Sequence, residues 1–166
     1  MTKTVPSVQV SGRFWRAGFR DRAGMILEPA GAPEGRWHHS GQTCLYLSAT
    51  PEGCRVAMKV YLQEDDPPRA VFPVKVTATV VTDLRTEAVR EALGIALADI
   101  HVFWAKIASA GQRPATWSIS DRLRDAGFDG ILTPSRSRPD LTHLSLFRWN
   151  GLGLPKVEPD GPPMDF

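Results

Sequence analysis

The sequence contains no long apolar segment. No run of apolar residues among the 166 approaches the roughly 20 that a membrane-spanning helix requires. Residues 1–10 also lack the basic segment followed by an apolar one that marks a secretory signal. We therefore expect a cytoplasmic protein with no membrane partner.

Cysteine and histidine are scarce. The two cysteines, Cys44 and Cys54, flank a strand-like segment, and in a reducing compartment we expect both to be free thiols. Of the four histidines only His38 and His39 are adjacent, and no pair of cysteines or histidines has the spacing of a zinc site. The sequence therefore predicts no bound metal.

The chain also lacks an excess of one charge. Its 20 basic and 18 acidic side chains leave a net charge of +2, which is too balanced to define a surface for nucleic acid. An apolar fraction of 42% in a chain of this length is typical of one domain. We predict a domain over residues 1–150. The tail at 151–166 has four prolines and few large apolar residues, so we expect it to be extended or disordered.

Several segments have the pattern of β-strands. VQVSGRFWRAGF, residues 8–19, alternates apolar and polar side chains, as a half-buried strand does. Residues 70–84 are rich in β-branched side chains and should form one long strand or two short ones, in which Pro73 indicates an edge position or a bulge. Further strands are expected at 43–48, 128–135 and 143–149.

Two segments carry helix signals at their ends. Thr50 can cap a helix whose first turn contains Pro51. A second helix, over about residues 118–126, precedes Gly127, which suits a C-terminal cap.

The segment 86–110 has helical periodicity, and a break near Gly94 would divide it into two helices. Residues 21–41 hold repeated glycine and proline with little periodicity, which predicts a long loop. Together these elements predict an α+β domain with a mixed, curved sheet and three or four helices.

Four pieces of the sequence match a known family in order and spacing. They are an early RFWR strand, a GRWHHSGQ loop leading into CLYLS, a helix beginning TPEG, and a late GFDGILTPS segment, and they span about residues 12–149. On these motifs the chain resembles the RES family, named for an arginine, a glutamate and a serine. The resemblance implies a fold like that of ADP-ribosyltransferases and a toxin that consumes NAD. It also implies an antitoxin partner with an Xre-like domain, and it is compatible with homo-oligomers.

The resemblance implies that arginines bind the pyrophosphate of NAD, because a planar guanidinium pairs bidentately with phosphate oxygens. Arg16 is the first candidate for this role, Arg36 the second and Arg13 the third. The alternative for Arg13 and Arg16 is a side chain that only extends from a strand edge into solvent.

Other side chains would hold the nicotinamide riboside. Tyr46 stands at the position of the family tyrosine, and Ser135 closes the TPS motif at the end of a strand. Without the resemblance, Tyr46 would be a core aromatic residue and Ser135 a turn residue. Further candidate binding residues, each with a purely structural alternative, are Trp37, His38, His39 and His143.

The family glutamate is missing. Cleavage of the nicotinamide bond builds positive charge on the ribose carbon, which a carboxylate stabilises. Its expected position is about Ala57. Glu52 could enter the same cleft from the helix N-terminus, or it could only interact with the helix dipole, which contributes about 0.3 to 1 kcal/mol.

Two functions therefore remain open. The first is a toxin-type enzyme that cleaves NAD with water, phosphate or a protein as acceptor, using Arg16, Tyr46, Glu52 and Ser135. The second is a catalytically weakened module that binds NAD or a partner. If the resemblance were due to chance, replacing Arg16 or Ser135 by alanine would change stability alone.

Overall fold

The computed structural model describes residues 6–166, so the first five residues of the predicted domain, and of the segment considered as a secretory signal, lie outside it. The strands are β1 (Val8–Phe19), β2 (Leu45–Ser48), β3 (Arg69–Asp83), β4 (Gly130–Pro134), β5 (Thr142–Leu146), β6 (Lys156–Pro159) and β7 (Met164–Asp165). The α-helices are α1 (Pro51–Met58), α2 (Glu87–Leu93), α3 (Leu97–Ile100), α4 (Trp104–Ser109) and α5 (Ala115–Asp125), and the 3-10 helices are η1 (Arg20–Met25) and η2 (Lys59–Tyr61).

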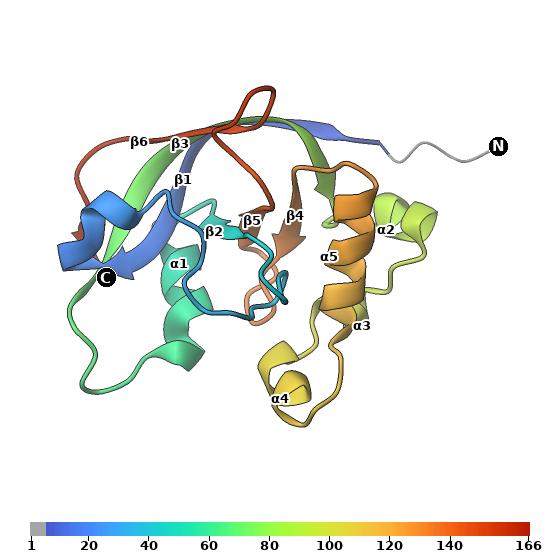
Figure 1. Ribbon diagram of the computed structural model, residues 1–166, viewed down its shortest axis with the longest axis horizontal. Coiled ribbons are helices and arrows are strands. Elements are labelled where there is room, and N and C mark those ends of the chain that lie inside the picture. The colour runs from blue at the N-terminus through green and yellow to red at the C-terminus, as the bar shows by residue number, and fades with distance from the viewer. Residues whose placement is uncertain (1–5) are drawn as a thin grey trace.

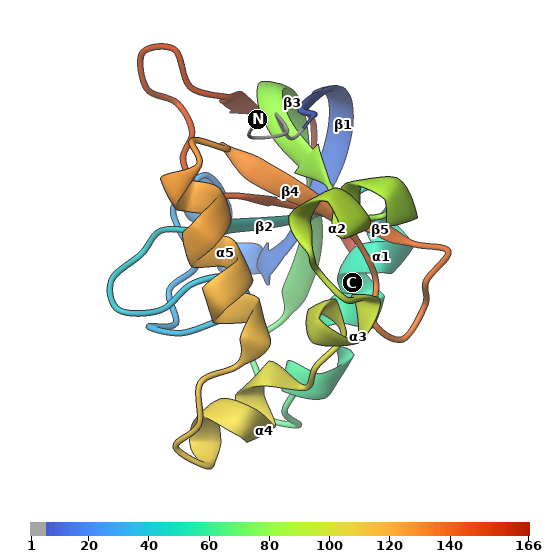
Figure 2. The same ribbon diagram turned by 90° about the vertical axis from the view of Figure 1, so that its right-hand side faces the viewer.

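The strands form one mixed, curved sheet, as the sequence predicts. Its order is β1-β2-β5-β4-β3-β6, and β1 also pairs with β3, so the path from β1 to β3 closes on itself. Only β3 and β4 run parallel among the strand pairs of the described residues. In Figure 1 the long strands β1 and β3 arch together over the top of the molecule, and Figure 2 shows β4 and β2 crossing behind α5.

The long strand β3 is not an edge strand, so the edge position considered for Pro73 is wrong, and the register of β3 with β1 continues through Pro73 without a bulge. Pro73 lies opposite Trp15 of β1, and on the other side β3 pairs with β6 from Val74 onward and with β7 up to Val71. The carbonyl of Pro73 accepts a hydrogen bond from the N–H of Asp160 at 3.0 Å. The proline nitrogen therefore faces the gap between β6 and β7, where no ladder hydrogen bond is lost.

The described residues contain five α-helices, more than the three or four expected, because the segment 86–110 forms three of them. The first break is the predicted one, since Gly94 ends α2 with a left-handed φ of 66°. A second break follows α3, where Arg36 donates to the carbonyl oxygens of Ile100 and Val102 at 3.0 and 2.8 Å. Arg36 lies 64 residues from Ile100 in the sequence, so the periodicity of segment 86–110 does not reveal this contact or the break beside it.

Two apolar clusters hold the elements together. The first lies within the curved sheet and includes Val157 of β6. The segment 151–166, predicted to be an extended or disordered tail, therefore contributes the strands β6 and β7 and one core residue to the sheet. The second packs α2, α3 and α5 against β4, Phe147 directly after β5, and the buried ring of Trp37. Both cysteine thiols are free, as predicted, and both residues are buried. No helix within residues 6–166 has the length and apolar character needed to cross a membrane.

Candidate functional site

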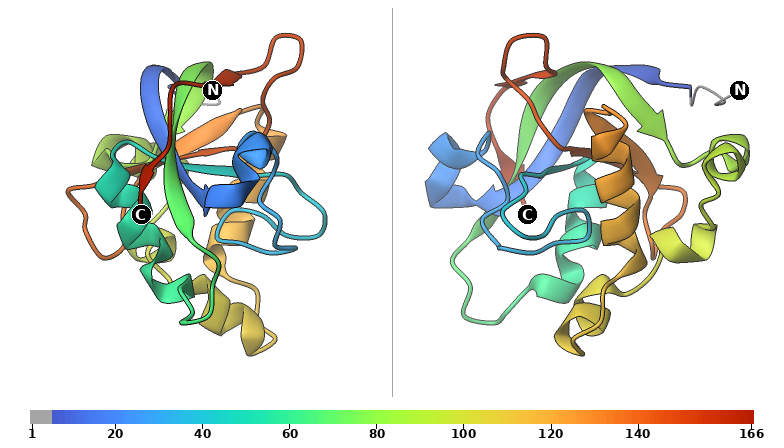
Figure 3. Two further views of the ribbon diagram at one scale, coloured as in Figure 1. Left: turned by 90° about the vertical axis from the view of Figure 1, so that its left-hand side faces the viewer. Right: turned by 45° about the vertical axis from the view of Figure 1, so that its right-hand side comes forward.

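The structure contains a cavity of about 730 Å³, in the size range of about 300 to 1,000 Å³ that is usual for ligand sites. Its walls come from β1, the loop after η1, β2, α1 and η2, the α3–α4 segment, and the adjoining ends of β4 and β5. The right-hand view of Figure 3 shows the loop after η1 running from η1 toward α5. Seven of the predicted site residues line this one cavity: Arg16, Arg36, Trp37, His38, Tyr46, Ser135 and His143.

Arg16 reaches from β1 to the loop after η1. Its Nη1 donates to the carbonyl oxygens of Met25, Ile26 and Glu28, the last at 2.6 Å. Burial lowers the pKa of Arg16, although nearby ionisable groups offset part of that effect. All the hydrogen bonds found for this guanidinium in residues 6–166 use Nη1, so its Nη2 and Nε groups keep their donor capacity.

Arg13 lies outside the cavity. It is three residues from Arg16 along one strand, and side chains at odd separations point to opposite faces of a sheet. Its Nε donates to Asp160 at 2.8 Å in an exposed ion pair. The alternation of the strand could have separated the two arginines from the sequence alone.

Tyr46, His38 and Trp37 form a fully assigned hydrogen-bond chain in the cavity wall. The Nε2 of His38 lies 2.8 Å from the carbonyl oxygen of Ala32, which can only accept, so Nε2 carries the proton. Tyr46 then donates to His38 Nδ1 at 2.7 Å and accepts from the N–H of Trp37 at 2.9 Å. Burial lowers the pKa of His38 and raises that of Tyr46, which favours the neutral form of both.

Gly35 permits this close arrangement. A Cβ atom at that position would lie 2.5 Å from the Tyr46 hydroxyl and 2.5 Å from His38 Cε1. The glycine of the GRW motif is therefore required by packing. Trp37 itself is 2% exposed and belongs to the second apolar cluster, so its ring is largely a core side chain.

Ser135 and His143 come from the adjoining ends of β4 and β5. Ser135 is buried, and its backbone N–H donates to the carbonyl of Leu141 at 2.9 Å. His143 Nδ1 lies 2.8 Å from the hydroxyl of Ser48 on the paired strand β2. Burial, assisted by the positive charge of Arg36, lowers the pKa of His143 to about 4, so it is neutral at neutral pH.

Glu52 does not enter the cavity. Its carboxylate is 58% exposed and lies 3.0 Å from Arg138. Ala57, the position of the missing family glutamate, does line the cavity. Positions 52 and 57 are about 140° apart around a helix with about 100° per residue, which explains why only one of them faces the cavity. The predicted cap of this helix is confirmed, since Thr50 Oγ1 accepts from the N–H of Gly53 at 3.0 Å.

The cavity contains further charged residues that the sequence analysis did not identify. The two carboxylates among its lining residues are Glu28 and Glu34, both exposed on the loop after η1. The additional lining residues with basic side chains, histidine included, are Arg22, Lys59, Arg69, His101 and Arg136. They come from separate elements, and only Arg136, directly after Ser135, had a neighbouring motif that could have indicated it.

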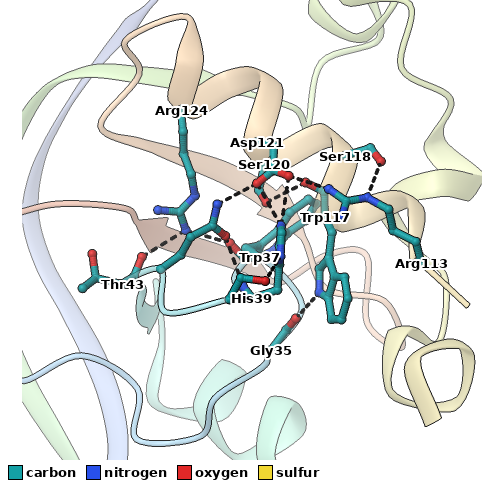
Figure 4. A network of polar contacts seen from close by, with 12 residues as sticks. Gly35, Trp37, His39, Thr43, Arg113, Trp117, Ser118, Ser120, Asp121 and Arg124 are labelled. Carbon is teal, nitrogen blue, oxygen red and sulfur yellow. Dashed lines mark hydrogen bonds and ion pairs between the residues drawn. The ribbon is translucent and has the colours of Figure 1, made fainter. Parts of the chain in front are cut away.

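His39 lies on the other side of the same loop, against α5 (Figure 4). Its Nε2 lies 2.9 Å from the carboxylate of Asp121, which also accepts from Gln42 at 2.7 Å and Arg113 at 2.5 Å. The ring stacks on Trp117 with centroids 4.8 Å apart. His39 was predicted to bind NAD, but its contacts attach the loop to α5.

Comparison with known proteins gives three findings. The RES domain model matches residues 11–165. A Mycobacterium tuberculosis protein named as a probable NAD(+) phosphorylase is 30% identical over 168 aligned positions, which cover 95% of this chain and 73% of that protein. A chain in the crystal structure of the M. tuberculosis MbcT–MbcA toxin–antitoxin complex matches with a TM-score of 0.65 and 19% identity, covering 96% of this chain and 86% of that one. At this identity the structural match shows a shared fold.

Proposed function

Because this chain belongs to the RES domain family, we propose that it cleaves the bond between nicotinamide and ribose in NAD, with inorganic phosphate as acceptor. The observation that carries the proposal is the shared cavity, which brings Arg16, Tyr46 and Ser135 together from three different strands or strand ends. The 30% identical relative, named for the same reaction, supports the choice of substrate and acceptor.

The charge of the cavity suits a dinucleotide. Six basic side chains line it, Arg16, Arg22, Arg36, Lys59, Arg69 and Arg136, against two carboxylates. The pyrophosphate of NAD carries two negative charges, and guanidinium groups bind phosphate oxygens through charge-assisted hydrogen bonds. We assign the pyrophosphate to Arg16, whose unused nitrogens can donate while Nη1 holds the loop.

The neutral side chains would hold the nicotinamide riboside. Tyr46 and His38 present a preorganised polar wall, and Ser135 and His143 offer hydroxyl and imidazole groups from the adjoining strand ends. In the reaction a phosphate oxygen forms a bond to the ribose carbon while the bond from that carbon to the nicotinamide nitrogen breaks. The electron pair of the broken bond neutralises the pyridinium, so nothing is oxidised or reduced.

The test is nicotinamide release by the purified protein at increasing phosphate concentration. The proposal expects a rate that rises with phosphate to saturation, with nicotinamide and a phosphorylated ADP-ribose formed in equal amounts. Release that is independent of phosphate would favour hydrolysis instead. Absence of any release would contradict NAD cleavage with either acceptor.

A second candidate function follows from Ala57. Because this position faces the cavity and Glu52 does not, the helix supplies no carboxylate to stabilise positive charge on the ribose carbon. The chain would then bind NAD and turn it over slowly or not at all. The discriminating variant is Ala57→Glu, which should raise nicotinamide release by at least tenfold if a carboxylate is limiting, with NAD binding measured by calorimetry alongside. No gain in a variant that still binds NAD would contradict this candidate.

We further propose an antitoxin partner, with an Xre-like domain, that covers the cavity in the cytoplasm. An enzyme that consumes NAD requires control, and the matched structure comes from a toxin–antitoxin complex. Large apolar side chains are exposed among the lining residues, namely Met25, Val60, Tyr61 and Phe103. Co-expression with the product of the adjacent reading frame should relieve growth inhibition, and a lack of binding between the two purified proteins would contradict the pairing.

A further inference from the structure

Two arginines meet at one short segment of the cavity wall. Arg36 Nη1 donates to the carbonyl oxygens of Ile100 and Val102, at the end of α3. Arg136 lies with its Cζ atom 5.1 Å from the ring centroid of Phe103, the next residue along the chain. Both arginines line the cavity, so their guanidinium groups concentrate positive charge beside the α3–α4 segment.

His101 lies in the middle of that segment and also lines the cavity. Its Nδ1 atom is buried and, within residues 6–166, has no hydrogen-bond partner. Burial lowers the pKa of His101, and the positive charges of Arg36, Arg136 and Arg90 lower it further, so the ring is neutral at neutral pH. A buried polar atom without a partner is unfavourable, and a ligand that satisfied it would remove that penalty.

No carboxylate neutralises this corner of the cavity in the part of the chain described. None of the ion pairs found within 4.0 Å includes Arg36 or Arg136. Arg69, a basic residue elsewhere in the same cavity, is by contrast paired with Asp66 at 2.9 Å. Two uncompensated guanidinium groups and an imidazole therefore suit a small anion with several acceptor oxygens.

The position of this corner separates it from Arg16. Arg136 directly follows Ser135, which we place beside the nicotinamide riboside. Arg16 is on β1 and its guanidinium contacts the loop after η1, whereas Arg36 and Arg136 contact the α3–α4 segment. The cavity thus has basic side chains at two different parts of its wall.

We propose that Arg36, His101 and Arg136 bind the inorganic phosphate that attacks the ribose carbon, while Arg16 holds the pyrophosphate of NAD. This assignment rests on the proposed function and names the part of the cavity that selects the acceptor. Phosphate held here presents one oxygen for the new bond to the ribose carbon, and nicotinamide departs with the electrons of the bond that breaks. Arg136 and His101 favour phosphate over water because no carboxylate among the described residues pairs with either of them.

The kinetic test uses Arg136→Ala, which removes an exposed side chain and leaves the core intact. Loss of a charge-assisted hydrogen bond should raise the KM for phosphate by roughly tenfold or more, with the KM for NAD within about twofold of the wild type. Arg136→Lys should give an intermediate KM for phosphate. The matched control is Arg138→Ala, which removes the same charge from the same loop but outside the cavity, where it pairs with Glu52 and Asp140. A raised KM for NAD with an unchanged KM for phosphate would assign the corner to the pyrophosphate and overturn the proposal.

A binding experiment tests the corner without turnover. Inorganic phosphate is titrated into the protein in the absence of NAD, and the imidazole signals of His101, assigned with His101→Gln, are followed by NMR. We expect a saturable shift in the wild type and in Arg138→Ala, and a much weaker one in Arg136→Ala. If the enzyme releases no nicotinamide, the proposed function fails, but this titration still decides the subsite. Unshifted His101 signals at saturating phosphate would overturn it.

Discussion

The loop from Gly35 to Thr43 has two sides with different chemistry. On the cavity side, Arg36 and His38 donate to backbone carbonyl oxygens. On the α5 side, His39 and Gln42 both bind the carboxylate of Asp121. Carbonyl oxygens hold a guanidinium in place without cancelling its charge, whereas a carboxylate neutralises a cation. The first arrangement keeps charge available for a ligand, and the second fastens the loop to the helix (Figure 4).

The largest difference is expected between the two arginines of β1. Arg16→Ala should lower kcat/KM for NAD by roughly 100-fold or more, because it removes pyrophosphate binding and releases the loop carbonyls. Arg13→Ala, on the opposite face of the same strand, should change it by less than about twofold, since an exposed ion pair contributes little. Steady-state kinetics on both variants measures this contrast. Equal losses of kcat/KM for NAD would contradict the assignment of Arg16, and not Arg13, to the pyrophosphate.

The neighbouring histidines should differ next. His38→Ala leaves the Tyr46 hydroxyl and the Ala32 carbonyl without their partner, which costs about 2 to 3 kcal/mol of unfolding free energy and at least tenfold in turnover. His39→Ala should cost about 1 kcal/mol and leave kcat/KM for NAD within about twofold. Urea denaturation and nicotinamide release on the same samples provide the two measurements. A larger loss of turnover in His39→Ala than in His38→Ala would contradict the assignment of His38 to the cavity side of the loop and His39 to the α5 side.

Asp121→Asn should weaken the α5 side in a pH-dependent way. Burial pushes the pKa of Asp121 upward, but hydrogen bonds from Gln42, His39 and Arg113 outweigh it, so the net pKa lies below its ordinary value. A depressed pKa in the folded state stabilises the protein above the unfolded value of about 3.9, and that stability is lost as the pH falls through the folded pKa. We expect the variant to be about 1 kcal/mol less stable than the wild type at pH 7.

The difference between wild type and Asp121→Asn should shrink as the pH falls below about 3.9, the unfolded value, and should disappear once the pH is below the depressed pKa of the folded carboxylate. Denaturation at pH 7 and at successively lower pH measures it, with His39→Ala as a variant that removes one partner of the same carboxylate. A difference independent of pH would mean that the charge of Asp121 does not hold the loop.

The smallest effect is expected from Glu52→Gln. The carboxylate lies outside the cavity in an exposed pair with Arg138, so turnover should change by less than about twofold and stability by less than about 0.5 kcal/mol. The corresponding measurement is kcat at saturating NAD and phosphate. A loss of 100-fold or more would show that Glu52 reaches the substrate after all and would restore the role first considered for it.

Local sequence patterns predicted most of the strands, and they predicted helix ends at Thr50, Gly94 and Gly127. These features depend on the alternation of apolar and polar side chains, on helix caps and on the positive φ that glycine adopts, all of which involve only a few neighbouring residues. The second break in segment 86–110 and the position of Pro73 between β6 and β7 depend on contacts from distant parts of the chain. A single sequence does not display such contacts.

The site shows the same division. Motif order brought Arg16, Tyr46 and Ser135 into one set, and the structure places them in one cavity. The spacing of about 100° per residue around a helix could have shown that Glu52 and Ala57 face different directions. The alternation of side chains along a strand could likewise have shown that Arg13 and Arg16 point to opposite faces of the sheet. His101 and Arg136 become candidates only through tertiary packing, because an unpartnered imidazole nitrogen is a property of the folded chain.

The measurement that tests the central claim most directly is product analysis after incubation of the protein with NAD and phosphate in water enriched in oxygen-18. If the cavity binds NAD and directs phosphate to its ribose carbon, nicotinamide and phosphorylated ADP-ribose will form in equal amounts, without label at the ribose carbon, and Arg16→Ala will form neither at a comparable rate. Nicotinamide release no faster than that of Arg16→Ala, or labelled ADP-ribose as the main product, would contradict the account.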